Sequence, residues 1–306
     1  LEMAPHVLVC GVLPRSHACG VFCFHSLHPI SRESNARATD QLPRQSAQVL
    51  LLVYVTERTC SSDTSICSNC APESKHKLVD MVFETKITAH KEVAKGTHEV
   101  TLVRPTPFSF KAGQYTQIAV PKLIHPDPKG RSRQFSVTSS PYDMGEIKVV
   151  FRATGSGFKE TLINTPVGAS VQVEQAAGSF LLPQKLTRPQ VFVAGGVGIA
   201  PFMSHLHQRI GEMWDHPVTL YYGNQNPESA AYLEELTQIS KQHRQFSLDT
   251  VYKRPTPGLF AKLAEKHADA MWWVVGPPGM VAVTVNGLQL GGIATGNVIT
   301  EPFEGY

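Results

Sequence analysis

The segment Val191-Phe192-Val193-Ala194-Gly195-Gly196-Val197-Gly198-Ile199-Ala200-Pro201 decides the fold of the second half of the chain. Its first four residues form an uninterrupted apolar run, which is typical of a strand buried on both faces of a parallel sheet. Apolar residues at helical spacing follow at positions 199, 202, 203, 206 and 210. Glycines at such a junction let a ligand approach the backbone, and the helix start offers N–H groups to an anion. Taken alone, the glycines are equally consistent with a tight turn.

Strands and helices alternate from this segment towards the C-terminus. The pattern predicts strands at Val218–Tyr222, Leu248–Tyr252 and Met271–Val275, a helix that starts at Asn226-Pro227, and a helix over Leu259–His267. This alternation predicts a doubly wound parallel sheet. Two further glycine-bearing loops, Gly223–Asn226 and Gly276–Met280, follow strands of that sheet. Because the carboxyl ends of parallel strands meet at one edge, three such loops favour a dinucleotide crevice over three unrelated turns.

A β-rich region precedes this α/β pattern. Six short strands, separated by Gly- and Pro-containing turns, predict an antiparallel barrel, with a single short helix at Gly157–Ile163. The expected strands are Val82–Thr88, Glu99–Arg104, Tyr115–Val120, Gln134–Thr138, Ile147–Arg152 and Ser170–Glu174. The predicted fold class is therefore α+β with two domains, a barrel over residues 79–185 and a parallel-sheet domain over residues 186–306.

Length and composition agree with two domains. The chain has 306 residues, of which 42% are hydrophobic, and a formal net charge of +3. The longest apolar run, Val49–Val55, is too short to span a bilayer, so we expect a soluble protein without a membrane span. The small net charge gives no electrostatic reason to expect a nucleic-acid partner.

Residues 1–78 differ from the rest of the chain. They hold all six cysteines and show no regular hydrophobic period, so the main body needs no disulfides and a reducing, cytoplasmic location is predicted. We favour a disordered or unreliable extension. A processed presequence, which would send the protein to an organellar matrix, is open because arginines outnumber acidic residues in Pro5–Thr56. A zinc module from Cys19-x3-Cys23 and Cys67-x2-Cys70 is disfavoured because the pairs are far apart. No metal site is expected.

Within the barrel region, Arg131-Ser132-Arg133-Gln134-Phe135-Ser136 carries a second candidate site. Arg133 and Phe135 are two residues apart and so share one face of a strand. A guanidinium there can bind a phosphate while the aromatic ring lies against a planar ligand. Taken alone, a basic turn followed by an ordinary strand explains the pattern as well.

Five pieces in this order resemble the ferredoxin–NADP reductase superfamily of flavin oxidoreductases, over about Val82–Tyr306. They are Arg133-x-Phe135-Ser136, Gly155-Ser156-Gly157-Phe158-Lys159, Gly195-Gly196-x-Gly198-x-x-Pro201, Gly276-Pro277-Pro278-Gly279-Met280 and Glu301-Pro302-Phe303-Glu304-Gly305-Tyr306. The resemblance implies an FAD-binding barrel followed by an NAD(P)-binding domain. FAD is preferred over FMN because the second piece suits a pyrophosphate.

The resemblance also implies roles for single residues. Arg133 would bind the flavin pyrophosphate, Phe135 would stack on the flavin ring, and Phe303 or Tyr306 would cover its other face. Ser136, Glu301 and Phe303 are the implied catalytic residues. The remaining expected cofactor-binding residues are Gln134, Phe151, Arg152, Ser156, Gly157, Phe158, Lys159, Gly195, Gly196, Gly198, Pro201, Asn224, Gln225, Gly276, Pro277, Pro278 and Met280.

Four positions depart from the family pattern. Phe135 stands where Tyr is usual, Ala200 where many members have Thr, and Val275 where many have Cys. Gln225 replaces the arginine that NADP-preferring relatives tend to carry, which favours NADH. Lys253 and Arg254 offer an alternative phosphate-binding charge, although a solvated loop pair is the simpler interpretation.

These features predict a flavin-dependent oxidoreductase that takes hydride from NADH or NADPH onto FAD and passes electrons to a separate acceptor. A plant-type iron–sulfur domain needs C-x4-C-x2-C and a later fourth cysteine, whereas this chain has Cys60-x6-Cys67-x2-Cys70 and none later. The alternative is a non-catalytic or weakly active flavin- or nucleotide-binding module, which the missing Thr and Cys favour.

Overall fold

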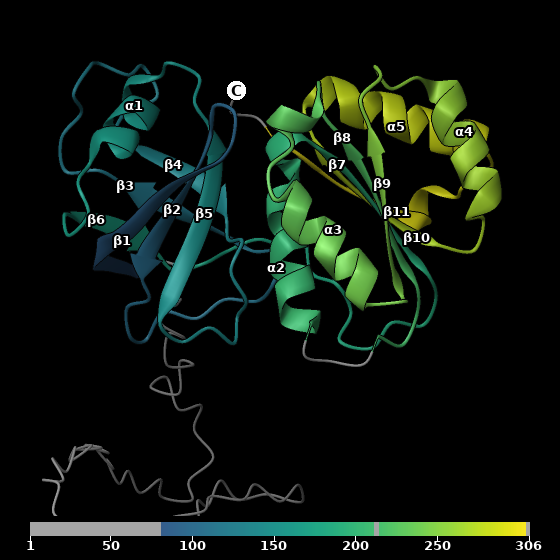
Figure 1. The fold of residues 1–306 in the computed structure, drawn as a ribbon, viewed down its shortest axis with the longest axis horizontal. Coiled ribbons are helices and arrows are strands. Elements are labelled where there is room, and N and C mark those ends of the chain that lie inside the picture. Colours follow the sequence, from purple (N-terminus) through teal and green to yellow (C-terminus); the bar gives the residue numbers. More distant parts are fainter. Residues whose placement is uncertain (1–80, 211–213, 304–306) are drawn as a thin grey trace, which may run out of the picture. The chain divides into compact units, whose positions relative to one another are not determined.

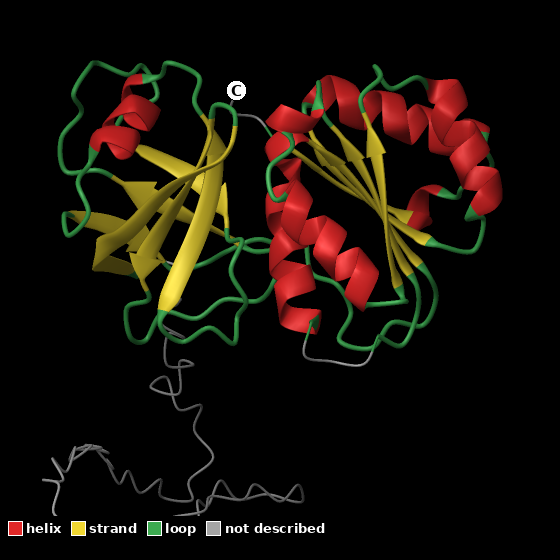
Figure 2. Cartoon of the chain, viewed as in Figure 1, coloured by secondary structure: helices red, strands yellow, loops and turns green. Residues whose placement is uncertain are grey.

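The computed structural model describes residues 81–210 and 214–303. All of them belong to one of the two units into which the chain's contacts divide it, Cys67–Tyr306. The predictions made for residues 1–78 and for Tyr306 lie outside the described residues. The described part contains two separate sheets, which Figures 1 and 2 show with the helices around them.

The first sheet is antiparallel and six-stranded, in the order β4-β3-β6-β1-β2-β5. Its strands are β1 (Val82–Ala94), β2 (Thr97–Val103), β3 (Tyr115–Ala119), β4 (Ser132–Ser136), β5 (Glu146–Arg152) and β6 (Ser170–Glu174). An antiparallel bridge between Val137 and Val149 joins the segment after β4 to β5, the strand at the other end of the order. The sheet therefore closes on itself, and the predicted six-stranded antiparallel barrel is confirmed.

Strand β1 shows how the sequence builds this barrel. Phe83, Thr85 and Ile87 alternate with exposed neighbours and point into the core, as a strand with one buried face requires. The prediction that this strand ends at Thr88 is wrong. It runs to Ala94 because it keeps pairing with β2 across two register shifts, and Gly96, with φ of 67°, then turns the chain back.

The barrel carries one short helix, α1 (Gly157–Asn164), between β5 and β6. The Ser156 side chain caps it by accepting the amide of Lys159. Phe158 and Leu162 are fully buried and join the barrel core. The helix therefore presents its first amides at a fixed place beside the barrel.

The second sheet is parallel, in the order β11-β10-β7-β8-β9. Its elements in chain order are β7 (Gln190–Gly195), the 3-10 turn η2 (Gly196–Ile199), α2 (Ala200–Arg209), β8 (Val218–Gly223), η3 (Pro227–Ser229), α3 (Leu233–Gln242), β9 (Phe246–Val251), α4 (Pro257–Lys266), β10 (Met271–Gly276), α5 (Pro278–Leu290), η4 (Thr295–Asn297) and β11 (Val298–Pro302). The last barrel strand ends at Glu174, and the first strand of the parallel sheet begins at Gln190. The domain boundary after residue 185 stays a prediction.

Helices cover both faces of the parallel sheet (Figure 1). Trp272 and Trp273 are neighbours on β10 that point to opposite faces, and both are at most 2% exposed. Trp273 packs in a core with residues of α2 and α3, whereas Trp272 packs in a second core with residues of α4 and α5. The predicted doubly wound sheet is confirmed.

Three local predictions need correction. The helix expected to start at Asn226-Pro227 is only the turn η3, because Asn226 and Ser229 close a reciprocal capping box there; α3 starts after Tyr232, whose φ is 60°. The expected loop Gly276–Met280 instead contains the first turn of α5, which begins at Pro278. Strand β9 begins at Phe246 and not at Leu248, because Phe246 pairs with Val218 of β8.

Candidate functional site

A cavity of about 570 Å³ lies at the carboxyl edge of the parallel sheet, where the ends of β7, β8 and β9 meet. Such an edge is where open α/β sheets bind ligands. The cavity is lined by Arg152, Val193, Ala194, Gly195, Gly196, Val197, Tyr221, Gly223, Asn224, Gln225, Val251, Tyr252, Lys253, Arg254, Pro255, Leu259, Phe260, Leu263, Pro277 and Met280. We call it the edge cavity.

Glycine is needed at the three positions of the strand–turn–helix unit for different structural reasons. A Cβ on Gly195 would come within 2.4 Å of the Met280 sulfur, and one on Gly198 within 2.5 Å of the Val275 carbonyl oxygen. These two glycines allow η2 to pack closely on the end of β10 and the start of α5. A Cβ on Gly196 would meet nothing within 4 Å, and its φ is 54°. Gly196 is therefore the glycine whose backbone borders open space.

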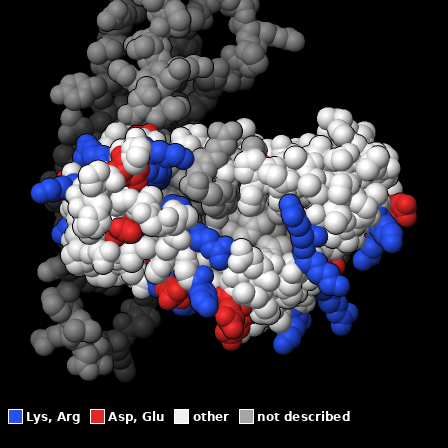
Figure 3. Space-filling model, turned by 90° about the horizontal axis from the view of Figure 1, so that it is seen from above, with Lys and Arg blue, Asp and Glu red and all other residues white. Residues whose placement is uncertain are grey.

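Basic side chains border the edge cavity. Arg152 comes from the end of β5, and the exposed Lys253 and Arg254 follow β9. Figure 3, which looks onto the molecule from above the view of Figure 1, shows several Lys and Arg side chains around an uncharged hollow. The charge favours an anionic ligand at this edge.

A second cavity, of about 480 Å³, lies between the barrel and the segment after β7; we call it the barrel cavity. Arg152 and Val197 line both cavities, so the two are neighbours. The barrel cavity is lined by Tyr115, Gln117, Lys129, Ser132, Arg133, Gln134, Phe135, Ser136, Val150, Phe151, Arg152, Lys159, Val197, Ala200, Glu301 and Phe303. Ligands in the two cavities would share a border.

Aromatic rings form one wall of the barrel cavity. The ring centroid of Phe135 lies 5.5 Å from that of Phe151 and 6.0 Å from that of Phe158. Phe135 is 7% exposed and Ser136 is 6% exposed, so the neighbours fix both side chains. A rigid aromatic wall of this kind suits a planar ring.

Arg133 is held firmly at the same cavity. Its Nη1 donates to the carbonyl oxygens of Lys129, Gly130 and Ser132, and its Nη2 donates to Asp127 Oδ1 at 2.5 Å. Its guanidinium carbon lies 5.3 Å from the ring centroid of Phe158, a cation–π contact. Asp127 is not among the site residues predicted from the sequence.

Glu301 and Phe303 reach the barrel cavity from β11 and the residue that follows it. The amide of Phe303 donates to the carbonyl of Gly276 at 3.1 Å, which fixes this end of the chain against β10. The Oε2 atom of Glu301 is buried and has no hydrogen-bond partner among the described residues. Burial raises the pKa of Glu301 to about 7.

This raised pKa predicts a pH-dependent stability. The folded state favours neutral Glu301, so its ionisation destabilises the fold increasingly as pH rises from about 4.5 to about 7. Glu301→Gln should match the parent chain at about pH 4 and exceed its free energy of unfolding by about 1 to 2 kcal/mol at about pH 8, allowing for partial exposure. Urea unfolding at both pH values measures this.

Glu84→Gln, at an exposed position of β1, serves as the control and should show no such pH dependence. An equal gain at both pH values for Glu301→Gln would show that packing, and not charge, causes the effect.

The structure brings most of the predicted site residues to these two cavities. The predicted residues that line the barrel cavity are Arg133, Gln134, Phe135, Ser136, Phe151, Arg152, Lys159, Glu301 and Phe303. The predicted residues that line the edge cavity are Arg152, Gly195, Gly196, Asn224, Gln225, Pro277 and Met280. Their roles towards a cofactor stay predictions.

Other predicted residues line neither of these two cavities; they are Ser156, Gly157, Phe158, Gly198, Pro201, Gly276 and Pro278. Phe158 and Pro201 are buried in the packing behind the cavities. Lining residues that sequence reasoning missed include Tyr115, Gln117, Lys129 and Tyr252. The position of Tyr252 at the carboxyl end of a predicted strand of the parallel sheet was a usable signal; the others carried none.

The donor set suits a flavin and a nicotinamide dinucleotide. An aromatic wall, the buried hydroxyl of Ser136 and nearby basic residues border the barrel cavity, and the open backbone at Gly196 borders the edge cavity. Among residues 81–210 and 214–303, no group of three or more His, Cys, Asp or Glu side chains could hold a metal ion. No helix in the part of the chain that the structure describes is long and apolar enough to cross a membrane.

The chain resembles known electron-transfer proteins. A family model for the oxidoreductase NAD-binding domain matches residues 192–286. The toluate 1,2-dioxygenase electron transfer component of Pseudomonas putida is 22% identical over 299 residues, which cover 94% of this chain and 85% of that protein. The terephthalate 1,2-dioxygenase reductase component 1 of Comamonas sp is 34% identical over 194 residues, 61% of this chain and 53% of the relative. The chain therefore spans about half the length of that relative.

A solved structure supports the same assignment at the level of the fold. The ferredoxin NADP+ reductase from Neisseria gonorrhoeae, with bound FAD and NADP, has a TM-score of 0.60 and 23% identity, and the match covers 72% of this chain and 98% of that one. The architecture, the NAD-binding model over residues 192–286 and the oxygenase reductase relatives support the ferredoxin–NADP reductase superfamily.

Proposed function

We propose that this chain is a flavin-dependent oxidoreductase that takes hydride from NAD(P)H onto FAD and passes the electrons to a separate acceptor. The observation that carries the proposal is the pair of neighbouring cavities that share Arg152 and Val197. One has the aromatic and basic lining that suits a flavin. The other lies at the strand edge that suits a dinucleotide.

The barrel side would bind and orient the flavin, which, when bound, accepts hydride and can release its electrons singly. Phe135 offers its ring to a planar ligand, and the Ser136 hydroxyl can donate a hydrogen bond beside it. Arg133 and Lys159 supply positive charge for the phosphates. Glu301, with a pKa raised to about 7, can hold a proton at its carboxyl near neutral pH.

The edge side would hold the nicotinamide dinucleotide. The backbone at Gly196 borders open space, and Asn224, Gln225 and Pro277 line the same cavity. Phe303 lines the barrel cavity together with Val197, one of the two residues that line both cavities. We assign to Phe303 the role of covering the flavin and excluding water until the nicotinamide arrives.

The acceptor in this proposal is a separate protein of the kind that the relatives' names indicate. One relative is an electron transfer component and another a reductase component of a dioxygenase. The cysteines of the chain, spaced Cys60-x6-Cys67-x2-Cys70, do not fit a plant-type iron–sulfur cluster. A cytoplasmic location belongs to the proposal, because cysteines are confined to the first 70 residues.

An anaerobic titration tests the proposal. The full chain, reconstituted with FAD, should lose the visible absorbance of oxidised flavin on addition of NADH or NADPH, and re-oxidation by ferricyanide should restore it. Reconstituted protein whose absorbance stays unchanged with both nucleotides contradicts the proposed reaction.

A second candidate function is a non-catalytic or weakly active flavin-binding module. Ala200 supports it, because this residue lines the barrel cavity where many family members have Thr. Val275 gives little support, since its side chain is fully buried in the core with α2 and α3 and lines neither cavity. Tight FAD binding without NAD(P)H:ferricyanide activity would favour this second function. Restoration of activity by Ala200→Thr would show that the missing Thr hydroxyl causes the low activity.

A further inference from the structure

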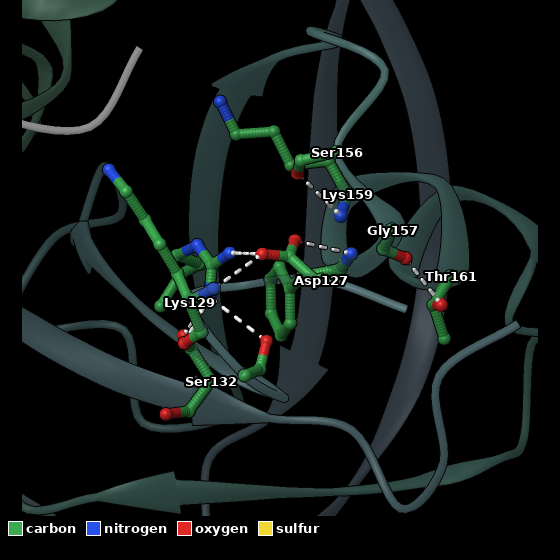
Figure 4. Close-up of polar contacts among 10 residues, drawn as sticks. Asp127, Lys129, Ser132, Ser156, Gly157, Lys159 and Thr161 are labelled. Carbon is green, nitrogen blue, oxygen red and sulfur yellow. Dashed lines mark hydrogen bonds and ion pairs between the residues drawn. The ribbon is translucent and has the colours of Figure 1, made fainter. Parts of the chain in front are cut away.

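The loop before β4 folds onto the start of α1 and places a carboxylate there. Asp127 Oδ2 accepts the amide of Phe158 at 3.0 Å, and its Oδ1 accepts the amide of Lys129 at 2.9 Å. Oδ1 also pairs with Arg133 Nη2 (Figure 4). The Asp127 side chain is only 3% exposed. The carboxylate thus bridges the guanidinium and the helix start.

The backbone of the same loop packs against the helix start. A Cβ on Gly157 would lie 2.3 Å from the carbonyl oxygen of His125 and 2.9 Å from that of Pro126. The next amide of the helix, that of Lys159, donates to the Ser156 hydroxyl at 3.3 Å. The first turn of α1 therefore already has intramolecular acceptors and close neighbours.

These contacts involve the two donors that a flavin phosphate is expected to use. The family resemblance assigns the pyrophosphate to Arg133 and to the amides that open α1, and Asp127 contacts one donor of each kind. A carboxylate and a phosphate oxygen accept the same charge-assisted hydrogen bonds. The two anions therefore compete for the guanidinium and the Phe158 amide.

The surroundings favour the ionised carboxylate and leave positive charge in excess. Hydrogen bonds from the Phe158 and Lys129 amides and the nearby Arg133 lower the pKa of Asp127 to about 2. Burial, together with the charges of Arg133 and Lys129, lowers the pKa of Lys159. Arg133 pairs with this carboxylate, and Lys129 and Lys159 add positive charge to the same region, an arrangement that also attracts a doubly charged phosphate group.

We propose that Asp127 acts as a built-in competitor for the flavin phosphate site and thereby sets how strongly the chain distinguishes phosphorylated flavins from riboflavin. This inference rests on the proposed flavin function and deepens it. Binding of FAD or FMN through Arg133 then requires Asp127 to yield the guanidinium and the Phe158 amide. Riboflavin has no phosphate and is indifferent to this exchange.

Asp127→Asn tests the competition, because it keeps the shape of the side chain and removes its charge. We expect the Kd of the full-length chain for FAD and for FMN to fall roughly tenfold, while the Kd for riboflavin stays within about twofold. Quenching of flavin fluorescence measures all three. Asp127→Ser, whose hydroxyl can still accept the Lys129 amide, is the second variant; it should also strengthen the binding of FAD and FMN and leave that of riboflavin nearly unchanged.

Asp143→Asn is the matched control. Asp143 accepts the amide two residues ahead, that of Gly145, as Asp127 accepts that of Lys129, but among the described residues its carboxyl forms no hydrogen bond with Arg133 or with α1. It should leave all three affinities unchanged. Weaker FAD and FMN binding by Asp127→Asn would overturn the proposal and make Asp127 a positioning residue for Arg133.

An equal loss for all three flavins, together with a lower melting temperature, would overturn it in favour of a structural role. Unchanged affinities in both Asp127 variants would overturn it too, with the proposed function intact. Absence of binding of any flavin, by the parent chain and every variant, would remove the proposed function and this inference with it.

Discussion

Gly198→Ala should lower kcat/KM for NAD(P)H about 100-fold, since a displacement of about 1 Å at a site can have an effect of that size. The added methyl group would lie 2.5 Å from the Val275 carbonyl oxygen and 3.0 Å from the Gly276 Cα. Both are backbone atoms at the end of β10, so they cannot rotate away. The turn η2 must move instead, and it carries Gly196 and Val197 into the cavities. Steady-state kinetics with both nucleotides measures the loss.

The same variant should lose about 1 to 3 kcal/mol of unfolding free energy, as overpacking usually does. Gly279→Ala is its matched control. A Cβ at Gly279 meets nothing within 4 Å, and Gly279 lies in the first turn of α5. Its activity should stay within about twofold and its stability should rise slightly, because Ala favours helix. If Gly198→Ala behaved like Gly279→Ala, close packing of η2 on β10 would not shape the site.

The sequence predicted the strands well where burial alone decides them. The apolar run at 191–194 became the fully buried strand β7, because a strand covered on both faces needs apolar residues at every position. The helix α5 was missed because Gly279, Asn286 and Gly287 are poor helix formers. Gly287 is needed for another reason: a Cβ there would lie 2.4 Å from the Pro257 carbonyl oxygen, at the contact of α4 with α5. Tertiary packing overrides local propensity here.

The candidate site likewise contains residues that the sequence predicted and residues that it did not. Arg133, Phe135 and Ser136 are adjacent in sequence on β4, so one motif located all three at the barrel cavity. No sequence motif pointed to Asp127 as a site residue. Its main partner, the Phe158 amide, lies 31 residues away and meets it only after the loop has folded onto α1. Contacts that join distant segments through backbone amides leave no trace in side-chain patterns.

The nicotinamide preference shows how the structure changes an expectation from sequence. Gln225 alone favoured NADH, because an arginine is usual in NADP-preferring relatives. In the structure, Gln225 shares the edge cavity with Lys253 and Arg254, both exposed and next to the end of β9. Two cations at one border of a cavity can bind a phosphate group even without the arginine. We therefore expect the chain to accept NADPH as well as NADH.

Replacing both Lys253 and Arg254 by Ala should lower kcat/KM for NADPH about 10- to 100-fold and change that for NADH by no more than about twofold. Each lost charge-assisted hydrogen bond contributes about 1.5 to 3 kcal/mol where it is sheltered, and exposure reduces that contribution. Raised ionic strength should weaken NADPH use in the parent chain and have little effect on the double variant. Lys262→Ala, on α4 and outside the cavity lining, is the control for a lost surface cation. An equal loss for both nucleotides would mean that the pair supports the shared part of the ligand or the loop itself, and not the phosphate that distinguishes NADPH.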